Sequence, residues 1–255
     1  MIKLELPEKP IELTEDKEKE LVNEYKLSEK PVWKQKFIVE PLLEMTHYKC
    51  AYSEQKLNSE SAYMQVEHFK HKDKYPNLVV KWGNLLPSCQ KCNGTKGTWD
   101  VVEQPIINPL EDTPSDHLYV KAFRFYKKDE KGGNTIDAVA LNDREHFVQP
   151  RAIIGFKMAD TIEILYEALQ NADTNRKKKF VVNKVKSVLS DCAPNNVYSA
   201  VLSTYLLYEL ESYISLKDLL KKLDLWDDEL KELESLLLSL AMPEPDKIIG
   251  SKQGV

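Results

Sequence analysis

Three of the four cysteines in this 255-residue chain fall in one stretch, with Cys50 followed by the pair Cys89 and Cys92. A Cys-x-x-Cys turn followed by Asn-Gly is typical of half a structural zinc site, because the tight turn aims both thiolates at one ion. Residues 48–100 show short apolar pieces and turn residues, with a helical period only around 82–86 and after Cys92. This stretch therefore predicts a small, loop-rich unit that something other than hydrophobic burial holds together.

A tetrahedral zinc site needs a fourth ligand, and the expected position carries Ser53, in Cys50-Ala-Tyr-Ser53. A serine hydroxyl is a poor zinc ligand at neutral pH, so the sequence supplies three thiolates and a gap. His47, a water or another side chain could complete the site. The alternative is that the cysteines are small buried residues or a redox pair.

Composition places few limits on the rest of the chain. Hydrophobic residues make up 42% and charged residues 30%, which is an ordinary globular balance. The longest apolar run of the C-terminal half, about 236–238, is far short of the ~20 residues that a membrane helix needs. The first residues carry acids and no apolar stretch, unlike a secretory signal. With so few cysteines, we expect a reducing cytoplasm and no membrane association.

Two helices and a hairpin are predicted around the cysteine-rich stretch. Thr14 is a typical N-cap for a helix over 14–27, and a second helix is expected over 33–45. Strand-like alternation over 120–126 and 135–141, on either side of a turn at 131–134, predicts a hairpin.

The chain after Pro150 is expected to be helical. Apolar spacing predicts helices over 153–172, 177–189, 197–213 and 216–242. The last of them carries a leucine stripe, which is read first as the core of a small bundle and second as an oligomer or partner surface. The stripe consists of Leu219, Leu220, Leu223, Leu230, Leu233, Leu237 and Leu240.

The net charge of −5 hides a segregation of charge along the chain. Residues 68–96 hold six lysines and one acid, whereas residues 209–246 hold eleven acids and four lysines. A basic segment attracts a nucleic-acid backbone. A second basic run, at 176–179, is read as a solvated helix face, with a second nucleic-acid contact as the alternative.

The residues between and beside the cysteines form a pattern that is more specific as a whole than any of its parts. Glu67-His68 is followed by Asn84, Cys89-x-x-Cys92 and Asn93. The pattern over 48–97 resembles the HNH nuclease motif in its His-Asn-Asn form. The phrases Glu-His-Phe-Lys, Asn-Leu-Leu-Pro-Ser-Cys and Pro-Ile-Ile-Asn-Pro-Leu resemble more closely the HNH subunit of Septu-type antiphage systems, a PtuB-like family that includes retron-associated effectors.

The resemblance, together with the helical periodicities, implies an α+β, mostly helical fold. A ββα-metal, treble-clef-like nuclease core with a hairpin extension would occupy 47–149. An N-terminal helical segment would occupy 1–46, a C-terminal helical bundle 150–242 and a flexible tail 243–255.

The resemblance also implies roles for matching residues. His68 would be the general base that deprotonates the attacking water, and Asn84 would brace the loop that orients it. Glu67 and Asn93 would hold one catalytic Mg²⁺ or Mn²⁺, since oxygen ligands suit a hard ion. Glu67 departs from the family in being longer than the Asp often found beside the base.

Cys50, Cys89 and Cys92 would bind a structural Zn²⁺, whose occupancy Ser53 puts in doubt. Candidates for phosphate contacts are Lys70, Lys72 and Lys96.

The implied function is that of a metal-dependent endonuclease, the effector of an antiphage complex with an ABC-type ATPase subunit. The expected substrate is DNA, with tRNA as the alternative, and the acidic C-terminal region is a hypothetical docking surface for the ATPase. The competing interpretation is a zinc-knuckle module that binds nucleic acid or protein without cutting. The missing fourth cysteine favours that interpretation, and the Glu67-His68, Asn84 and Asn93 set opposes it.

Overall fold

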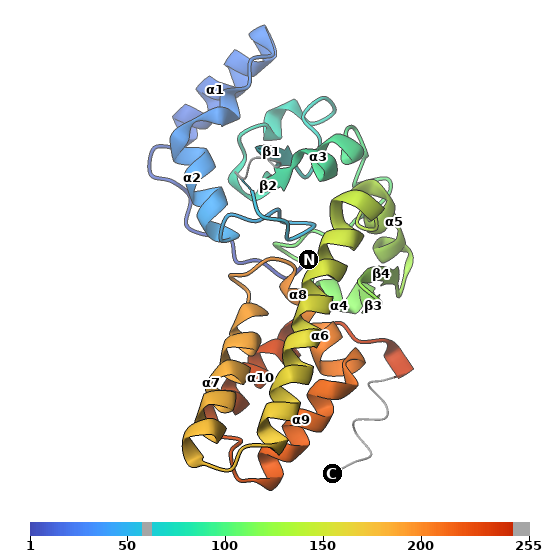
Figure 1. Cartoon of the computed structure of the whole chain (residues 1–255). Helices are drawn as coiled ribbons and strands as arrows, with labels where there is room; N and C mark the ends of the chain where they lie inside the picture. Colours follow the sequence, from blue (N-terminus) through green and yellow to red (C-terminus); the bar gives the residue numbers. More distant parts are fainter. Residues whose placement is uncertain (58–62, 247–255) are drawn as a thin grey trace. The chain divides into compact units, whose positions relative to one another are not determined.

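The computed structural model describes residues 1–57 and 63–246 (Figure 1). Their packing divides the chain into two compact units. The first comprises Met1–His117 and Lys127–Leu141, and the second comprises Leu118–Tyr126 and Asn142–Val255. This division does not follow the segment boundaries expected from the sequence, because 118–126 and 142–149, expected in the central core, pack with the second unit. Most of the predicted tail, 247–255, lies outside the described residues.

The chain is mostly helical, with two small antiparallel sheets. The first unit contains α1 (Glu15–Ser28), α2 (Lys36–Met45), β1 (Met64–His68), β2 (Leu85–Cys89), α3 (Gln90–Lys96), α4 (Pro114–His117) and α5 (Glu130–Ala138). The second contains α6 (Gln149–Gln170), α7 (Asn175–Asp191), α8 (Ser199–Thr204), α9 (Glu211–Lys222) and α10 (Asp228–Leu240). Strands β3 (Leu118–Lys121) and β4 (Arg124–Lys127) form the second sheet.

The N-terminal helices form where they were predicted. Thr14 caps α1 by accepting a hydrogen bond from the Lys17 amide, and Glu29 ends the helix in the left-handed conformation. One face of α1 buries Leu21 and Tyr25 in a core that also contains Ile38 of α2 and residues of both strands. The N-terminal helices therefore share their core with the first sheet.

The first sheet and α3 form a compact strand–strand–helix unit. β1 pairs antiparallel with β2, and the register sets Glu67 opposite Leu86 and His68 opposite Leu85. β2 is buried along its whole length, and α3 begins at the residue that follows it. The order β1–β2–α3 is the one that a ββα core requires.

The predicted hairpin is wrong in its second strand and in its turn. The chain reverses at Ala122 and Phe123, both with positive φ, so that β4 follows β3 directly. Residues 131–134, expected to be the turn, lie inside α5, which Asp129 caps by accepting a hydrogen bond from the Gly132 amide. Two-residue hairpin turns usually contain Gly or Asn. Because the turn at Ala122 and Phe123 contains neither residue, no local sequence pattern predicts it.

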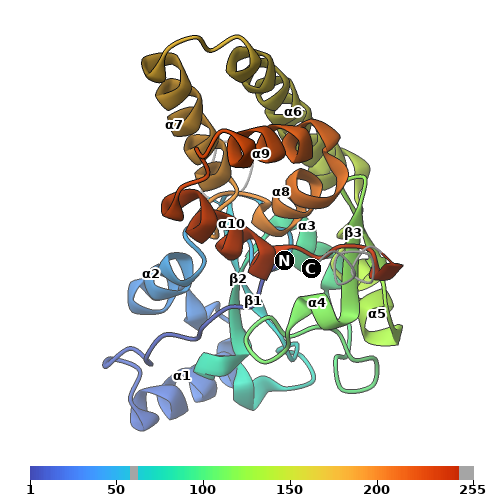
Figure 2. The ribbon, with the colours of Figure 1, turned by 90° about the horizontal axis from the view of Figure 1, so that it is seen from below.

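The second unit is a helical bundle in which α6 packs on α7 and α9, and α10 closes on α7 and α8 (Figure 2). The predicted helix over 197–213 is interrupted by a π-helical turn at Tyr205–Glu209 and by extended backbone at Leu210. The predicted helix over 216–242 is two helices, because Asp224 takes a positive φ and Asp227 caps a new start.

Part of the leucine stripe belongs to the bundle core, in agreement with the first interpretation, whereas Leu223 is exposed. Leu220, Leu230 and Leu237 are fully buried, together with Leu216. The buried part of the stripe therefore cannot serve as a docking surface.

One charged side chain is fully buried in the second unit. The guanidinium of Arg151 lies over the rings of Phe125, Phe147 and Tyr198, at 4.9, 5.5 and 5.5 Å from their centroids. Cation–π contacts of this kind favour a buried Arg over a buried Lys. None of the helices in the described part of the chain is long and apolar enough to cross a bilayer.

Candidate functional site

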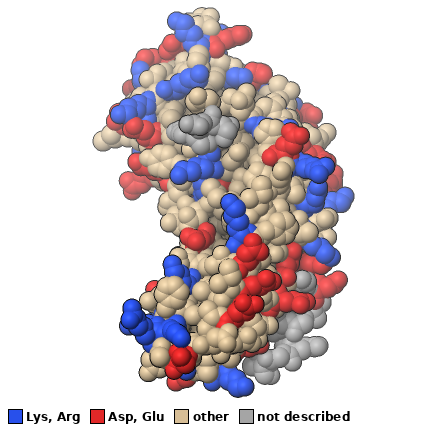
Figure 3. Space-filling model, in the orientation of Figure 1, with Lys and Arg blue, Asp and Glu red and all other residues tan. Residues whose placement is uncertain are grey.

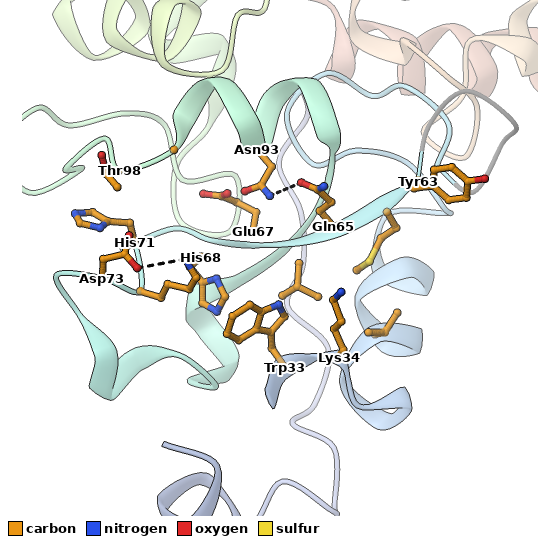
Figure 4. Close-up of a pocket in the computed structure, with 15 residues that line it drawn as sticks. Trp33, Lys34, Tyr63, Gln65, Glu67, His68, His71, Asp73, Asn93 and Thr98 are labelled. Atoms are coloured by element: carbon orange, nitrogen blue, oxygen red, sulfur yellow. Dashed lines mark hydrogen bonds and ion pairs between the residues drawn. The ribbon is translucent and has the colours of Figure 1, made fainter. Parts of the chain in front are cut away.

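Strand β1 presents its candidate residues on two opposite faces, because side chains alternate along a strand. Gln65 and Glu67 point toward α3, whereas His68 points away from it, toward Trp33 (Figure 4). All four residues line one cavity of about 780 Å³. The cavity therefore reaches around the end of the strand and joins both faces.

Glu67 is buried and paired with a lysine of α3. Its Oε1 lies 2.5 Å from Nζ of Lys96, and the two side chains are 3% and 0% exposed. Burial raises the pKa of Glu67 to about 7, although the Lys96 ammonium acts to lower it. The ammonium of Lys96 thus favours the ionised form of Glu67, which burial disfavours.

Asn93 faces β1 from α3, one helical turn before Lys96. Its Nδ2 donates a hydrogen bond to Oε1 of Gln65 at 2.5 Å. With the amide nitrogen occupied, Oδ1 is the Asn93 atom that remains to accept a cation. Glu67 and Asn93 are thus brought together, and their carboxylate and amide oxygens form a donor set that suits Mg²⁺ or Mn²⁺.

His68 is held by a carbonyl and an indole. Its Nε2 lies 2.9 Å from the carbonyl oxygen of Val79, so Nε2 carries the proton and donates it, which leaves Nδ1 as the lone-pair nitrogen. The Trp33 ring meets the imidazole edge-on, with centroids 4.6 Å apart. Burial lowers the pKa of His68 to about 4. The imidazole is therefore neutral at pH 7 and can accept a proton.

Asn84 joins the two ends of the loop between the strands. Its Oδ1 accepts a hydrogen bond from the Lys70 amide at 2.8 Å, and its Nδ2 donates to the carbonyls of Lys70 and Leu78, both at 3.1 Å. Leu78 precedes Val79, whose carbonyl holds His68. Asn84 therefore fixes the backbone that orients the imidazole.

The three cysteines of the 48–100 stretch meet in the interior, and all are unbridged. The Sγ atoms of Cys50, Cys89 and Cys92 lie within 4.8 Å of one another. Burial acts to raise the pKa of the Cys50 thiol, but hydrogen bonds with Cys89, Cys92 and Ser53 outweigh it and hold that pKa well below its usual range. Three clustered thiols, one of them readily ionised, fit a Zn²⁺ ion.

Two hydroxyls stand at the thiol cluster. Ser53 Oγ lies 3.8 Å from Sγ of Cys89, and Ser88 Oγ lies 3.6 Å from Sγ of Cys50. His47, suggested as a fourth ligand, is exposed, and no histidine of the described residues belongs to the cluster. The hydroxyls of Ser53 and Ser88 are thus polar groups that lie beside the thiols.

Three of the six lysines of the 68–96 segment pair with acids outside it, and Lys72 pairs with Asp73 inside it. Lys74 pairs with Asp100 and Glu103, and Lys81 lies 3.9 Å from Glu18. Lys96, expected to contact phosphate, is instead buried against Glu67, so this expectation needs correction. Counting charge along the sequence missed these pairs because the acids lie elsewhere in the chain.

Two of the expected phosphate contacts remain candidates. Lys72 lines the cavity, and Lys70 is half-buried beside it in the chain. Sequence reasoning did not single out Trp33, Lys34, Tyr63 and Gln65, which also line the cavity. Trp33 and Lys34 precede the motif, and no local pattern marks them. The alternation along β1 could have placed Gln65 beside Glu67.

Known relatives were found by sequence. The chain is 40% identical over 240 residues to the Septu protein PtuB of Bacillus thuringiensis, an alignment that covers 92% of this chain and 93% of the relative. It is 26% identical over 210 residues to the Septu protein PtuB of Bacillus mycoides (strain KBAB4), covering 64% of this chain and 70% of that relative. No family model and no solved structure matches the chain.

Proposed function

This chain belongs to the Septu PtuB family, and from that premise we propose that it is a metal-dependent HNH endonuclease, the effector of an antiphage defence complex. The observation that supports the proposal is the convergence of a neutral imidazole with a lone pair on Nδ1, a buried carboxylate and an amide oxygen on one cavity. Binding alone has no use for a general base, whereas phosphodiester hydrolysis uses both a base and ligands for a divalent cation.

His68 is the general base in this proposal. Its Nδ1 accepts the proton of the attacking water, while the Val79 carbonyl and the Trp33 ring hold the imidazole in one orientation. A low pKa guarantees the neutral form at pH 7. The negative charge of a bound phosphodiester raises that pKa toward the working range as the substrate arrives.

Glu67 and Asn93 Oδ1 are the residues that would hold one divalent cation. When bound, such an ion neutralises charge on the phosphoryl oxygens and stabilises the leaving oxygen. Lys34 and Lys72 line the same cavity, where their ammonium groups would attract the phosphates of the substrate backbone. Asn84 acts on the backbone that orients His68 and contacts no substrate.

The thiol cluster is a structural Zn²⁺ site in this proposal. It joins the segment around Cys50 to the end of β2 and the start of α3. Cys50, Cys89 and Cys92 would hold the ion, and a Zn²⁺ bound there would fix the helix that carries Asn93.

The proposed partner is an ABC-type ATPase subunit, and the proposed substrate is DNA. The test is a cleavage assay on the purified chain, alone and together with the ATPase, with Mg²⁺ or Mn²⁺. Supercoiled plasmid and total tRNA are offered side by side, and the substrate that is cut distinguishes DNA from RNA. Binding of nucleic acid without cutting in every condition would favour the non-catalytic module.

His68→Ala should lower the cleavage rate by about 10²–10⁴-fold. The matched control is His71→Ala. His71 lines the same cavity, but its ring packs edge-on against Tyr75, whereas that of His68 packs against Trp33. This control should stay within about threefold of the parent chain, far less than the loss of a general base. Equal losses in both variants would contradict the assigned role of His68.

A further inference from the structure

The pair formed by Lys96 and Glu67 stands out from every other ion pair of the site. Lys34 is exposed and Lys72 is partly exposed at the cavity, whereas the Lys96 side chain is 0% exposed. Lys96 is the last residue of α3, and Gly97 ends the helix there with a φ of +47° that other residues rarely adopt. The helix end therefore fixes where the ammonium lies.

The Lys96 ammonium is anchored to β1 at two successive residues. It lies 2.5 Å from Glu67 Oε1 and donates a hydrogen bond to the carbonyl oxygen of His68 at 3.0 Å. A buried ammonium or carboxylate is strongly disfavoured unless it is paired. Each of these two groups therefore depends on the other.

Helix α3 makes two cross-links to one face of β1. Asn93 bonds to Gln65, and Lys96, one turn later, pairs with Glu67. The ammonium thus contacts the same carboxylate that, with Asn93, forms the proposed metal site. A divalent cation bound to Glu67 would meet a positive charge already in place.

We propose that Lys96 is the resident counter-cation of Glu67, against which a divalent ion must compete, so that Lys96 sets the metal affinity of the site. This inference rests on the proposed function, because it takes Glu67 as a ligand of the catalytic cation. Lys96 is a positioning residue here and contacts no substrate. In the metal-free protein its ammonium pairs with the buried carboxylate and holds it in place.

The direction of the effect follows from Coulomb repulsion. Replacing Lys96 by Met keeps the length and apolar stem of the side chain and removes the charge beside the carboxylate. Repulsion between Lys96 and a divalent ion at a few ångströms is strong in a buried site. Lys96→Met should therefore bind Mn²⁺ at least about tenfold more tightly than the parent chain.

The test measures Mn²⁺ binding to the full chain by calorimetry at about pH 8.5, where carboxylates are ionised. Glu67→Gln identifies the site, since it should abolish the Mn²⁺ binding that Lys96→Met strengthens. Lys34→Met is the matched control, because Lys34 lines the same cavity without touching Glu67. That control should bind Mn²⁺ within about threefold of the parent chain, which would show that the effect is local.

The metal-free Lys96→Met variant should melt at a lower temperature and gain more from Mn²⁺ than the parent chain does. If it does not fold, Lys96→Gln retains an amide donor for Glu67 without the charge and should also bind Mn²⁺ more tightly. The inference would be overturned, and the proposed function left intact, if Lys96→Met and Lys96→Gln bound Mn²⁺ no more tightly than the parent chain. No Mn²⁺ binding to any of these proteins would overturn both.

Discussion

The two units differ most in what fills their interiors. Among the residues that the structure describes, eleven buried polar or charged side chains belong to the first unit and four to the second. In the first, Glu54 pairs with the terminal amine of Met1 at 2.7 Å, and Glu67 pairs with Lys96. In the second, Thr204 bonds to a carbonyl of its own helix, and the single buried charge, Arg151, lies among aromatic rings.

This difference shows which interactions stabilise each unit. The second unit buries periodic apolar faces, so its free energy of unfolding comes mostly from area removed from water. The first unit orders charges, an imidazole and three thiols, whose burial is tolerable only when each has a partner. Its stability should therefore respond to metal and to pH, whereas that of the helical unit should respond to packing.

The largest expected contrast is between two buried cysteines. Cys92→Ala removes a ligand of the proposed zinc site in the first unit, and we expect it to lower the free energy of unfolding by at least about 3 kcal/mol. Cys192→Ala, in the second unit, removes an equally buried sulfur that contacts Met158, and should cost about 1–2 kcal/mol.

Urea unfolding monitored by Trp fluorescence measures these costs. Trp33, Trp82 and Trp99 lie in the first unit and only Trp226 lies in the second. A chelator should destabilise the parent chain and leave Cys92→Ala unchanged. Equal costs for the two cysteines, or no response to the chelator, would remove the contrast.

The second contrast is in pH dependence. The pKa of His68 falls from 6.5 to about 4 on folding, so the unfolded chain binds more protons between these values, and the His68 contribution to stability is lost as pH falls through this window. The cost of His68→Gln should therefore shrink by up to about 2 kcal/mol between pH 7 and pH 5.

Glu67 acts in the opposite direction, because its pKa is raised to about 7 and its buried charge destabilises the fold as pH rises. Repeating the His68→Gln measurement in a Glu67→Gln background separates the two groups. Urea midpoints at both pH values provide the readout. A His68→Gln cost that is the same at pH 5 and pH 7 would show that the imidazole is not held neutral.

The third contrast is in packing. A Cβ added to Gly155 on α6 would lie 2.3 Å from Cε1 of Phe123, so Gly155→Ala should cost about 1–3 kcal/mol in the second unit. Gly94 on α3 of the first unit has no atom within 4 Å of such a Cβ, and Gly94→Ala should stabilise by about 0.5–1 kcal/mol. Thermal melting by circular dichroism distinguishes the signs, and destabilisation of both variants would contradict this expectation.

The smallest expected effect is one that the units share. Thr14 caps α1 of the first unit by accepting from the Lys17 amide at 3.2 Å, and Thr174 caps α7 of the second by accepting from the Lys177 amide at 3.3 Å. Replacing either by Ala should cost about 1 kcal/mol. Chemical denaturation should give equal values within a few tenths of a kcal/mol, and a larger difference would show that capping depends on the surrounding unit.

The sequence predicted the helices better than the turns, for a physical reason. Amphipathic spacing survives in any helix that buries one face, as in α1 and α6. The reversal at Ala122 and Phe123 depends on tertiary contacts, since Phe123 packs against Phe156 and Tyr205 of the bundle. No local residue preference could reveal it.

The sequence motif named the candidate residues but not their contacts. Glu67, His68 and Asn93 line the cavity, and Asn84 binds the backbone of the neighbouring loop, whereas the roles of all four stay predictions. The phosphate contact expected of Lys96 was wrong, because the sequence alone does not show that this lysine is buried. Trp33 and Lys34 come from a helical turn before the motif, so only the fold could place them at the cavity.

The alternation along β1 limits which insertions and deletions the chain can tolerate. Glu67 and His68 face opposite ways because the register pairs them with Leu86 and Leu85. One residue gained or lost inside β1 would exchange the two faces and turn the carboxylate toward Trp33 and the imidazole toward α3. Length changes should therefore inactivate the protein anywhere within 65–68 or 84–96.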